Sequence, residues 1–202
     1  MNITFFRSLP NRIYLYNSQR APMLLPTKNS FVHPVLFSSI QQPINLVLGG
    51  GGMKGVAHVA LLEYLEENQV PICSISGSSV GALVGAMYAS GQRPADILYF
   101  FRDTPLFRYS WLNPIKGGLF DSDRYLDILK TYVFSDFADL EIPLYVVATN
   151  LHQGCPVYFR EGDLYQTLLA SCAVPGVFCP IEIAGELYSD GAIMDNFPLA
   201  PF

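Results

Sequence analysis

The amino-acid sequence predicts a three-layer α/β fold in which helices flank a mainly parallel central sheet. Three short apolar runs support this prediction, at residues 44–48 (INLVL), 72–75 (ICSI) and 144–148 (LYVVA). Short, mainly apolar runs of this length are typical of strands that are buried on both faces, as in parallel sheets. Segments with the apolar spacing of helices lie between them, and strands that alternate with helices indicate right-handed crossovers.

The first two predicted helices each follow a strand. After the glycines at 49–52, apolar residues at helical spacing form a stripe that we expect to face the core. The stripe comprises Ala57, Ala60, Leu61, Tyr64 and Leu65. The second helix, over about 80–90, is rich in glycine and alanine. Small side chains would let it lie close against the sheet.

Three further helices and a hairpin complete the predicted elements. Pro94 favours a helix start, and residues 164–173 have helical character. Residues 181–188 are typical of a hairpin that turns near Gly185. Ser122 can cap another helix, whose apolar stripe comprises Tyr125, Ile128, Leu129, Tyr132 and Val133.

An aromatic loop at residues 107–120 separates two of these helices. Loops between helices often carry function, so Tyr109, Trp111 and Leu112 are candidates for contact with lipid. Packing in the core is an equally open alternative for these side chains.

Composition limits the class of protein. The chain has 202 residues, enough for one domain with a sizeable core. Hydrophobic residues make up 50% and charged residues 14%, and the mean hydropathy is +0.28. No apolar run reaches the roughly 18 residues of a transmembrane helix. The net charge of −5 argues against a nucleic-acid partner.

The cysteines do not predict a metal site. The four cysteines form no C-x-x-C pair and have no histidines at metal-ligand spacing; they are Cys73, Cys155, Cys172 and Cys179. We expect the thiols to be reduced and buried.

Residues 1–43 differ in charge from the predicted domain at 44–202. They contain no Asp or Glu, and their basic residues are Arg7, Arg12, Arg20 and Lys28. We expect a poorly ordered extension, although an organelle transit segment or a membrane-surface arm stays open. The segment lacks the continuous apolar region of a signal peptide. The expected location is therefore cytoplasmic or peripherally membrane-associated.

A glycine-rich loop follows the first strand. Gly50-x-Gly52-x-x-Gly55 formally matches the dinucleotide-binding fingerprint, but the acidic residue required about 20 positions later is missing. The phosphate-binding loop pattern fails because Gly55, not Ser or Thr, follows Lys54. The favoured alternative is a loop whose N–H groups hold the oxyanion of a tetrahedral intermediate.

A nucleophile turn follows the second strand. Gly77-Ser78-Ser79-Val80-Gly81 has the Gly-x-Ser-x-Gly arrangement that presents a serine on a sharp strand-to-helix turn. The nucleophile would be Ser79, which needs a base to accept its proton. The three histidines, His33, His58 and His152, do not follow it in a convincing catalytic context. For His58 we expect a structural or exposed position.

A carboxylate is the remaining candidate for the base. Asp190-Gly191-Ala192 directly follows the predicted hairpin strand. Partial burial raises the pKa of a carboxylate and makes proton abstraction more feasible. Asp195 is an alternative candidate for the base, and spacing alone does not exclude it.

Five segments, in this order, resemble the patatin-like phospholipases: LGGGGMKGVAHVALLEYL, GSSVGA, PLYVVATNL, LLASCAVPGVFCPIE and YSDGAIMDNFP. The similarity covers residues 44 to 198. It implies a patatin-like fold and a dyad of Ser79 as nucleophile and Asp190 as proton acceptor. It also implies an oxyanion hole formed by the loop Gly50, Gly51, Gly52, Met53, Lys54 and Gly55.

The implied activity is hydrolysis of acyl esters of phospholipids, lysophospholipids or neutral lipids, with no metal or cofactor required by the dyad. The partner would be the lipid or lysolipid itself, with peripheral membrane contact as an option. Members of the family continue beyond the Asn-x-Pro that ends the last segment, whereas this chain stops at Phe202. The alternative is therefore a catalytically silent lipid-binding or interaction protein, derived from the same fold by truncation.

Overall fold

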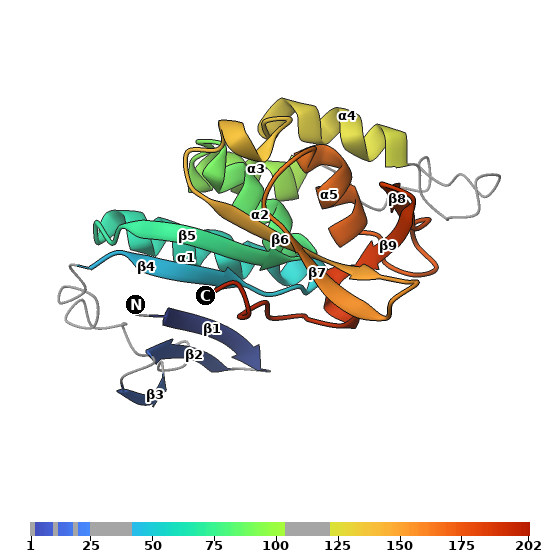
Figure 1. The fold of residues 1–202 in the computed structure, drawn as a ribbon. Helices are drawn as coiled ribbons and strands as arrows, with labels where there is room; N and C mark the ends of the chain where they lie inside the picture. Colours follow the sequence, from blue (N-terminus) through green and yellow to red (C-terminus); the bar gives the residue numbers. More distant parts are fainter. Residues whose placement is uncertain (1–2, 10–11, 18–19, 25–41, 104–121) are drawn as a thin grey trace.

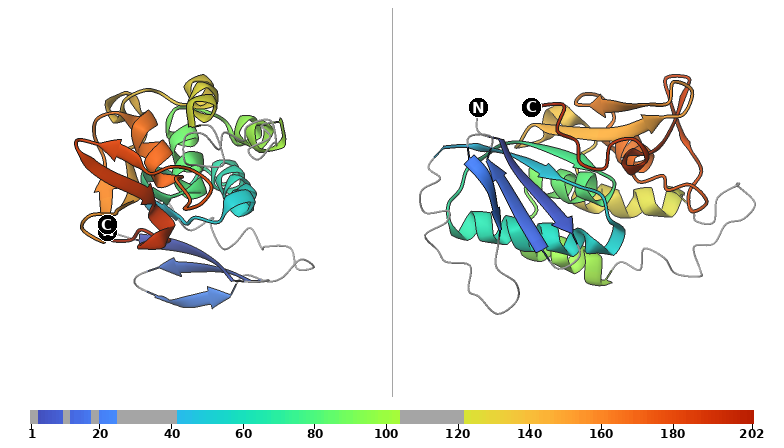
Figure 2. Two further views of the ribbon diagram at one scale, coloured as in Figure 1. Left: turned by 90° about the vertical axis from the view of Figure 1, so that its right-hand side faces the viewer. Right: turned by 90° about the horizontal axis from the view of Figure 1, so that it is seen from below.

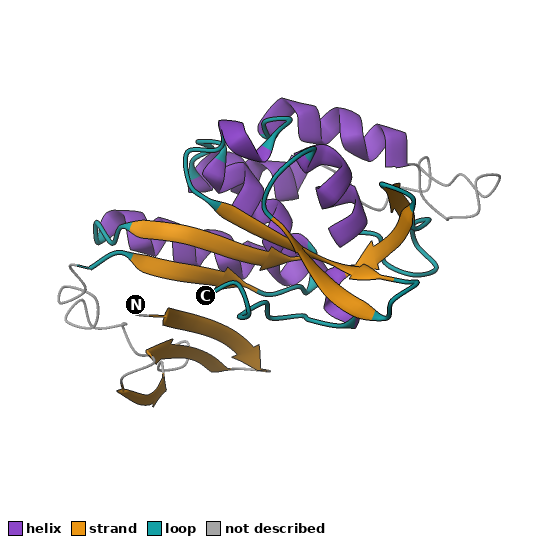
Figure 3. Ribbon diagram, in the orientation of Figure 1, coloured by secondary structure: helices purple, strands orange, loops and turns teal. Residues whose placement is uncertain are grey.

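The computed structural model describes residues 3–9, 12–17, 20–24, 42–103 and 122–202. It is a mixed α/β structure whose strands form one sheet in the order β3-β2-β1-β4-β5-β6-β9-β8, with β7 also paired to β6 (Figure 1). The centre of the sheet is parallel, and helices flank it, which confirms the predicted class (Figure 3).

Three parallel strands form the core of the sheet. They are β4 (Ile44–Leu48), β5 (Ile72–Ser78) and β6 (Leu144–Asn150). In register, Leu48 pairs with Gly77, and Gly77 pairs with Val146. The carboxyl ends of all three strands therefore lie at one edge of the sheet, where open α/β sheets place their sites.

The flanking strands are antiparallel. The predicted hairpin is present as β8 (Ile181–Ile183) and β9 (Glu186–Asp190), and Gly185 at its turn has a φ of 82°. Strand β9 runs antiparallel to β6 and pairs Asp190 with Ala148. On the other side of the sheet, β1 (Ile3–Leu9) pairs parallel with β4, and β2 (Arg12–Asn17) and β3 (Arg20–Leu24) extend the sheet further.

Within the predicted domain at 44–202, one described strand was not predicted. β7 (Cys155–Phe159) pairs antiparallel with β6, directly after the turn that follows it. All five of its residues are half-buried. The strand therefore has neither two buried faces nor an alternation of buried and exposed residues, and a proline inside the run CPVYF disfavours a strand from sequence.

Helix α1 (Val56–Glu67) is present, but the predicted buried face is wrong. Its buried residues are His58, Val59, Leu62 and Leu65, whereas Ala57 and Ala60 are exposed. Apolar residues nearly surround this helix, so spacing alone did not select the face that packs. A 3-10 turn, η2 (Gly52–Gly55), leads into the helix.

Helix α2 (Val80–Ala89) confirms the expectation of close packing, because all its residues except Tyr88 are buried. A Cβ atom at Gly81 would overlap the carbonyl of Leu48, and one at Gly85 would lie 2.9 Å from Cγ2 of Ile75. Helices α1, α2 and α3 (Pro94–Asp103) gather on one face of β4 and β5 (Figures 1 and 2).

Of the last two helices, α5 (Leu164–Ser171) covers the far half of the sheet, and α4 (Ser122–Tyr132) packs on α5. On α4 the predicted stripe faces inward, with Tyr125, Leu129 and the following Val133 buried. Helix α5 packs on β6, β8 and β9. The candidate lipid-contact residues Tyr109, Trp111 and Leu112 lie outside the described residues.

Two smaller findings complete the fold. Cys73 is exposed rather than buried, because it lies at the beginning of β5, before that strand passes under the helices. Within the described ranges, no helix combines the length and the apolarity that crossing a bilayer requires.

Candidate active site

Ser79 occupies a strained turn between β5 and α2. Its backbone has a φ of 52° and a ψ of −125°, in a region that residues with a side chain rarely adopt. Both flanking glycines are required, because there is no room for a side chain at either position. A Cβ atom at Gly77 would lie 2.5 Å from the backbone of Ala82, and one at Gly81 would overlap Leu48. The sequence pattern is therefore explained by the close approach of α2 to the sheet.

The structure brings Ser79 and Asp190 together. The Ser79 Oγ donates a hydrogen bond to Oδ2 of Asp190 over 2.7 Å. Asp190 ends β9 and is only 3% exposed. Its other carboxylate oxygen accepts the N–H of Ala192 over 2.8 Å, at the start of the 3-10 turn η6 (Gly191–Ile193). The carboxylate is thus held in one orientation, with one oxygen facing the serine.

Burial dominates the acidity of Asp190. Loss of water around the carboxyl raises its pKa, and the hydrogen bonds from Ser79 and from the Ala192 N–H oppose this rise only in part. A carboxylate with a raised pKa is a stronger base than one in water.

The glycine loop lies against the serine. A Cβ atom at Gly50 would lie 3.2 Å from Cβ of Ser79 and 2.5 Å from Oδ1 of Asn196. The Gly50 N–H itself donates to the carbonyl of Asn196 over 3.2 Å. Gly52 has a φ of 57°, which favours glycine, and Lys54 is exposed. Glycine at position 50 therefore allows the loop to approach both the nucleophile turn and the segment after Asp190.

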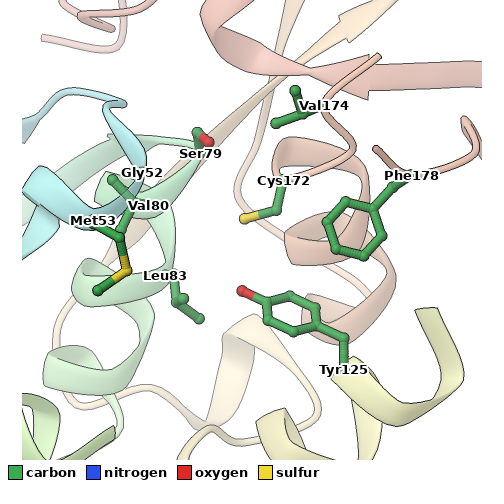
Figure 4. A pocket seen from close by; sticks show the side chains of 9 residues that line it. All are labelled: Gly52, Met53, Ser79, Val80, Leu83, Tyr125, Cys172, Val174 and Phe178. Atoms are coloured by element: carbon green, nitrogen blue, oxygen red, sulfur yellow. The ribbon is translucent and has the colours of Figure 1, made fainter. Parts of the chain in front are cut away.

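A pocket of about 80 Å³ opens beside Ser79. Apart from Ser79, its lining is mostly apolar and comes from the glycine loop, α2, α4 and the segment after α5 (Figure 4). The lining residues are Gly52, Met53, Ser79, Val80, Leu83, Tyr125, Cys172, Val174 and Phe178. Such a cavity suits an apolar ligand rather than a charged one.

Two polar atoms face this pocket opposite Ser79. The hydroxyl of Tyr125 and the thiol of Cys172 point toward each other across it and are hydrogen-bonded (Figure 4). Burial raises the pKa of both groups, and the negative charge of Asp190 raises them further. Both groups are therefore neutral at physiological pH, so the pocket carries no second negative charge.

The histidines take other positions. His58 is buried, its Nε2 lies 2.7 Å from the carbonyl of Gly49, and burial lowers its pKa. Of the two positions that the sequence left open, structural or exposed, His58 takes the structural one. The Nδ1 of His152 lies 2.9 Å from Oε2 of the exposed Glu186, and His33 lies outside the described residues.

The alternative candidate for the base, Asp195, is engaged elsewhere. Its Oδ2 accepts the hydroxyl of Tyr158 over 2.6 Å, and its Oδ1 accepts the Phe197 N–H over 3.1 Å. Burial and this hydrogen bond raise the pKa of Tyr158 to about 12. Asp195 therefore ties the C-terminal segment to β7, whereas the hydroxyl of Ser79 is bonded to Asp190.

Several polar residues at the site were not singled out from the sequence. The Ser79 N–H donates to the hydroxyl of Ser171 over 2.9 Å, and the hydroxyl of Thr149 donates to the carbonyl of Asp190 over 2.9 Å. Ser171 lies in the segment LLASCAVPG, where a serine interrupts an otherwise apolar helix end. That interruption was the available signal.

Comparisons with known proteins identify the family and the fold. A family model described as patatin-like phospholipase matches residues 46–202. An uncharacterized NTE family protein of Mycobacterium tuberculosis is 35% identical over 161 residues, which cover 78% of this chain and 45% of the relative. The lysophospholipase NTE1 of Cryptococcus neoformans is 32% identical over 174 residues, with 79% of this chain and 10% of that protein covered.

Among solved structures, VipD from Legionella pneumophila superimposes with a TM-score of 0.66 at 18% identity, over 76% of this chain and 46% of that one. This likeness concerns the fold. The chain spans less than half the length of these relatives. The family model covers most of the chain, and its match includes both Ser79 and Asp190. The chain belongs to the patatin-like phospholipase family.

Proposed function

We propose that this chain is a serine acyl hydrolase that cleaves fatty-acyl esters of phospholipids, lysophospholipids or related lipids. The observation that carries the proposal is the 2.7 Å hydrogen bond from the Ser79 hydroxyl to the buried carboxylate of Asp190, at the mouth of an apolar pocket. A hydroxyl bonded to a base beside a cavity for an acyl chain is the arrangement that acyl transfer requires.

The reaction would proceed in two steps. Ser79 attacks the ester carbonyl while Asp190 takes the hydroxyl proton, and collapse of the tetrahedral intermediate passes this proton to the departing alcohol. An acyl-enzyme remains on Ser79. Water then attacks it, with Asp190 accepting a proton from the water and returning it to Ser79 as the fatty acid leaves.

The oxyanion would be held by N–H groups of the glycine loop. The Gly50 N–H is engaged by Asn196, so we assign the donors to the residues that follow it, with Gly51 and Gly52 first. Lys54 and Gly55 would support the loop, and Met53 would contact substrate. One such donor typically contributes about 2.7–4 kcal/mol to lowering the barrier.

The substrate class follows from the pocket and from the relatives. The nine lining residues form a mostly apolar cavity whose Tyr125 and Cys172 side chains are neutral, and relatives at 30–32% identity are named lysophospholipases. Lysophospholipids are therefore the first substrates to test, followed by phospholipids and neutral glycerides.

A fluorophosphonate probe tests the proposal directly. We expect it to label the wild-type protein at Ser79 and to leave Ser79→Ala unlabelled, because phosphonylation needs the activated hydroxyl. Release of fatty acid from the lipid panel should be lost in the same variant.

The control is Ser78→Ala, which removes the neighbouring buried hydroxyl. It should label normally, since Ser78 lies outside the hydrogen bond to Asp190. Wild-type protein that binds lipid but neither labels nor releases fatty acid would contradict the proposal. It would favour a silent lipid-binding protein instead.

A further inference from the structure

The two residues of the proposed dyad come from distant parts of the chain. Ser79 lies between β5 and α2, and Asp190 lies 111 residues later at the end of β9. Reacting groups must be held to within a fraction of an ångström, since a misplacement of about 1 Å can cost about 10²-fold in rate. Something must therefore connect the serine turn to the end of β9.

Ser171 holds the serine turn. Its hydroxyl, at the end of α5, accepts the Ser79 N–H over 2.9 Å and donates to the carbonyl of Val147 over 2.7 Å. The side chain is fully buried. Val147 pairs with Ser78 in the sheet, so this single hydroxyl links the turn both to α5 and to β6. Both of its hydrogen-bonding directions are used.

Ala173 holds the end of β9. Its carbonyl accepts the Asp190 N–H over 3.0 Å and the hydroxyl of Ser189 over 2.6 Å. The Ser79 N–H is therefore bonded to position 171, and the Asp190 N–H to position 173. Between them, Cys172 points its side chain into the pocket (Figure 4).

We propose that residues Ser171–Ala173 form a clamp that sets the distance between Ser79 and Asp190, and that Ser171 is a positioning residue for the nucleophile. The inference rests on the proposed function. The strained backbone of Ser79 is the physical reason for the clamp. A residue with a φ of 52° keeps that conformation only where its surroundings over-determine it, and the bond to Ser171 supplies one of those restraints.

Ser171→Ala tests the clamp, and Ser76→Ala is its matched control. Both serines are fully buried, but the hydroxyl of Ser76 has no partner among the described residues. In Ser171→Ala we expect kcat to fall about tenfold to 100-fold with KM little changed, because the turn loses its restraint while the pocket stays intact. Ser76→Ala should keep the wild-type kcat.

The pH profile separates positioning from general destabilisation. Asp190 is faced by the hydroxyl of Ser79, the N–H of Ala192, and the neutral groups of Tyr125 and Cys172. The bond from Ser79 lowers the pKa of Asp190. When that bond weakens in Ser171→Ala, the acid limb of the kcat profile should move to higher pH, and in Ser76→Ala it should stay in place.

Two further variants guard against an unfolded protein. Ser171→Cys fills nearly the same space but offers only a weak acceptor, so it should reproduce the loss of kcat. Ser171→Thr retains the hydroxyl and should recover most of the activity.

Amide hydrogen exchange tests the clamp without catalysis. The Ser79 N–H should exchange faster in Ser171→Ala than in wild type or Ser76→Ala, because its acceptor is gone. If Ser171→Ala had the same kcat as wild type and its acid limb did not move, the clamp would be overturned, while the proposed function would still stand. An inactive, unlabelled wild-type protein would overturn the proposed function, and an unchanged exchange rate at Ser79 would then overturn the clamp as well.

Discussion

At the scale of single residues, the site depends on one short hydrogen bond between a hydroxyl and a carboxylate. The bond forms because Asp190 is buried and oriented by its neighbours, whereas Asp195 is held by Tyr158. The two histidines that the structure describes, His58 and His152, take a structural and an exposed position. The chemistry of the site should therefore follow Asp190.

Replacing Asp190 by Asn should abolish esterase activity. The amide is nearly isosteric but cannot accept the proton, and loss of a general base typically costs about 10²–10⁴-fold. Steady-state hydrolysis of a soluble aryl ester measures this loss. Asp195→Asn is the matched control and should keep most activity, because the Tyr158 hydroxyl can still donate to the amide oxygen. If Asp195→Asn were the inactive variant, the assignment of the base would be wrong.

Asp190→Asn should also stabilise the folded protein at neutral pH. Burial raises the pKa of Asp190 above its value in the unfolded chain, so the folded state binds the proton more tightly. That contribution to stability is complete below the unfolded pKa of roughly 3.9 and is lost as the pH rises through the folded pKa. The Asn side chain of Asp190→Asn does not ionise, so this variant does not lose that stability as the pH rises.

Thermal unfolding at pH 7 and at pH 4 measures this effect. We expect Asp190→Asn to have the higher Tm at pH 7, with the difference from wild type narrowing at pH 4. A Tm for Asp190→Asn below that of wild type at pH 7 would show that the carboxylate stabilises the fold rather than straining it.

At the scale of elements, the close approach of α2 to the sheet places Ser79 at the pocket. The helix can lie this close only because glycines stand where a side chain would meet backbone. Gly81 faces the carbonyl of Leu48, a rigid group, whereas Gly85 faces the side chain of Ile75. The two positions should differ in what they tolerate.

Gly81→Ala should destabilise the protein more than Gly85→Ala. Overpacking against backbone typically costs about 1–3 kcal/mol or more, while at Gly85 the gain of up to about 1 kcal/mol in helix propensity offsets part of a milder clash. Urea unfolding compares the two free energies. Equal losses would mean that α2 can shift away from Leu48 without penalty.

Elements were predictable from sequence where one local signal was sufficient. The runs at β4, β5 and β6 indicated buried strands, and Gly185 marked the hairpin turn. The buried face of α1 was not predictable, because apolar residues nearly surround that helix. Ser79 and Asp190 were proposed from their motifs. For Ser171 the local signal was only a serine in an apolar helix end, and its bond to Ser79, 92 residues away in sequence, follows from no local pattern.

At the scale of the whole molecule, exposed apolar side chains lie near the pocket. Met53 is 54% exposed and Val174 41%, and both line the pocket. Ile193 and Met194, just after Asp190, are each 48% exposed. We propose that this side of the molecule contacts the lipid surface from which the substrate is taken.

Ile193→Gln should weaken binding to phospholipid vesicles about tenfold to 100-fold, because insertion of an isoleucine side chain contributes about 1.5–3 kcal/mol. Turnover of a soluble ester should be unchanged. Leu98→Gln is the control, since Leu98 is 47% exposed on α3, which contributes no described residue to the pocket. Vesicle sedimentation measures the affinity, and equal weakening in both variants would contradict a specific contact face.

The position of Asp190 at the end of the hairpin also links catalysis to the order in which the protein is made. A ribosome that has released the chain as far as α5 has produced the serine turn and the hydroxyl of Ser171, but no proton acceptor. In the proposed mechanism, the nucleophile becomes reactive only when β9 has docked beside β6 and brought Asp190 to Ala173. On that mechanism, an unfinished chain, or a folded one whose last hairpin has detached, would be chemically silent toward ester substrates.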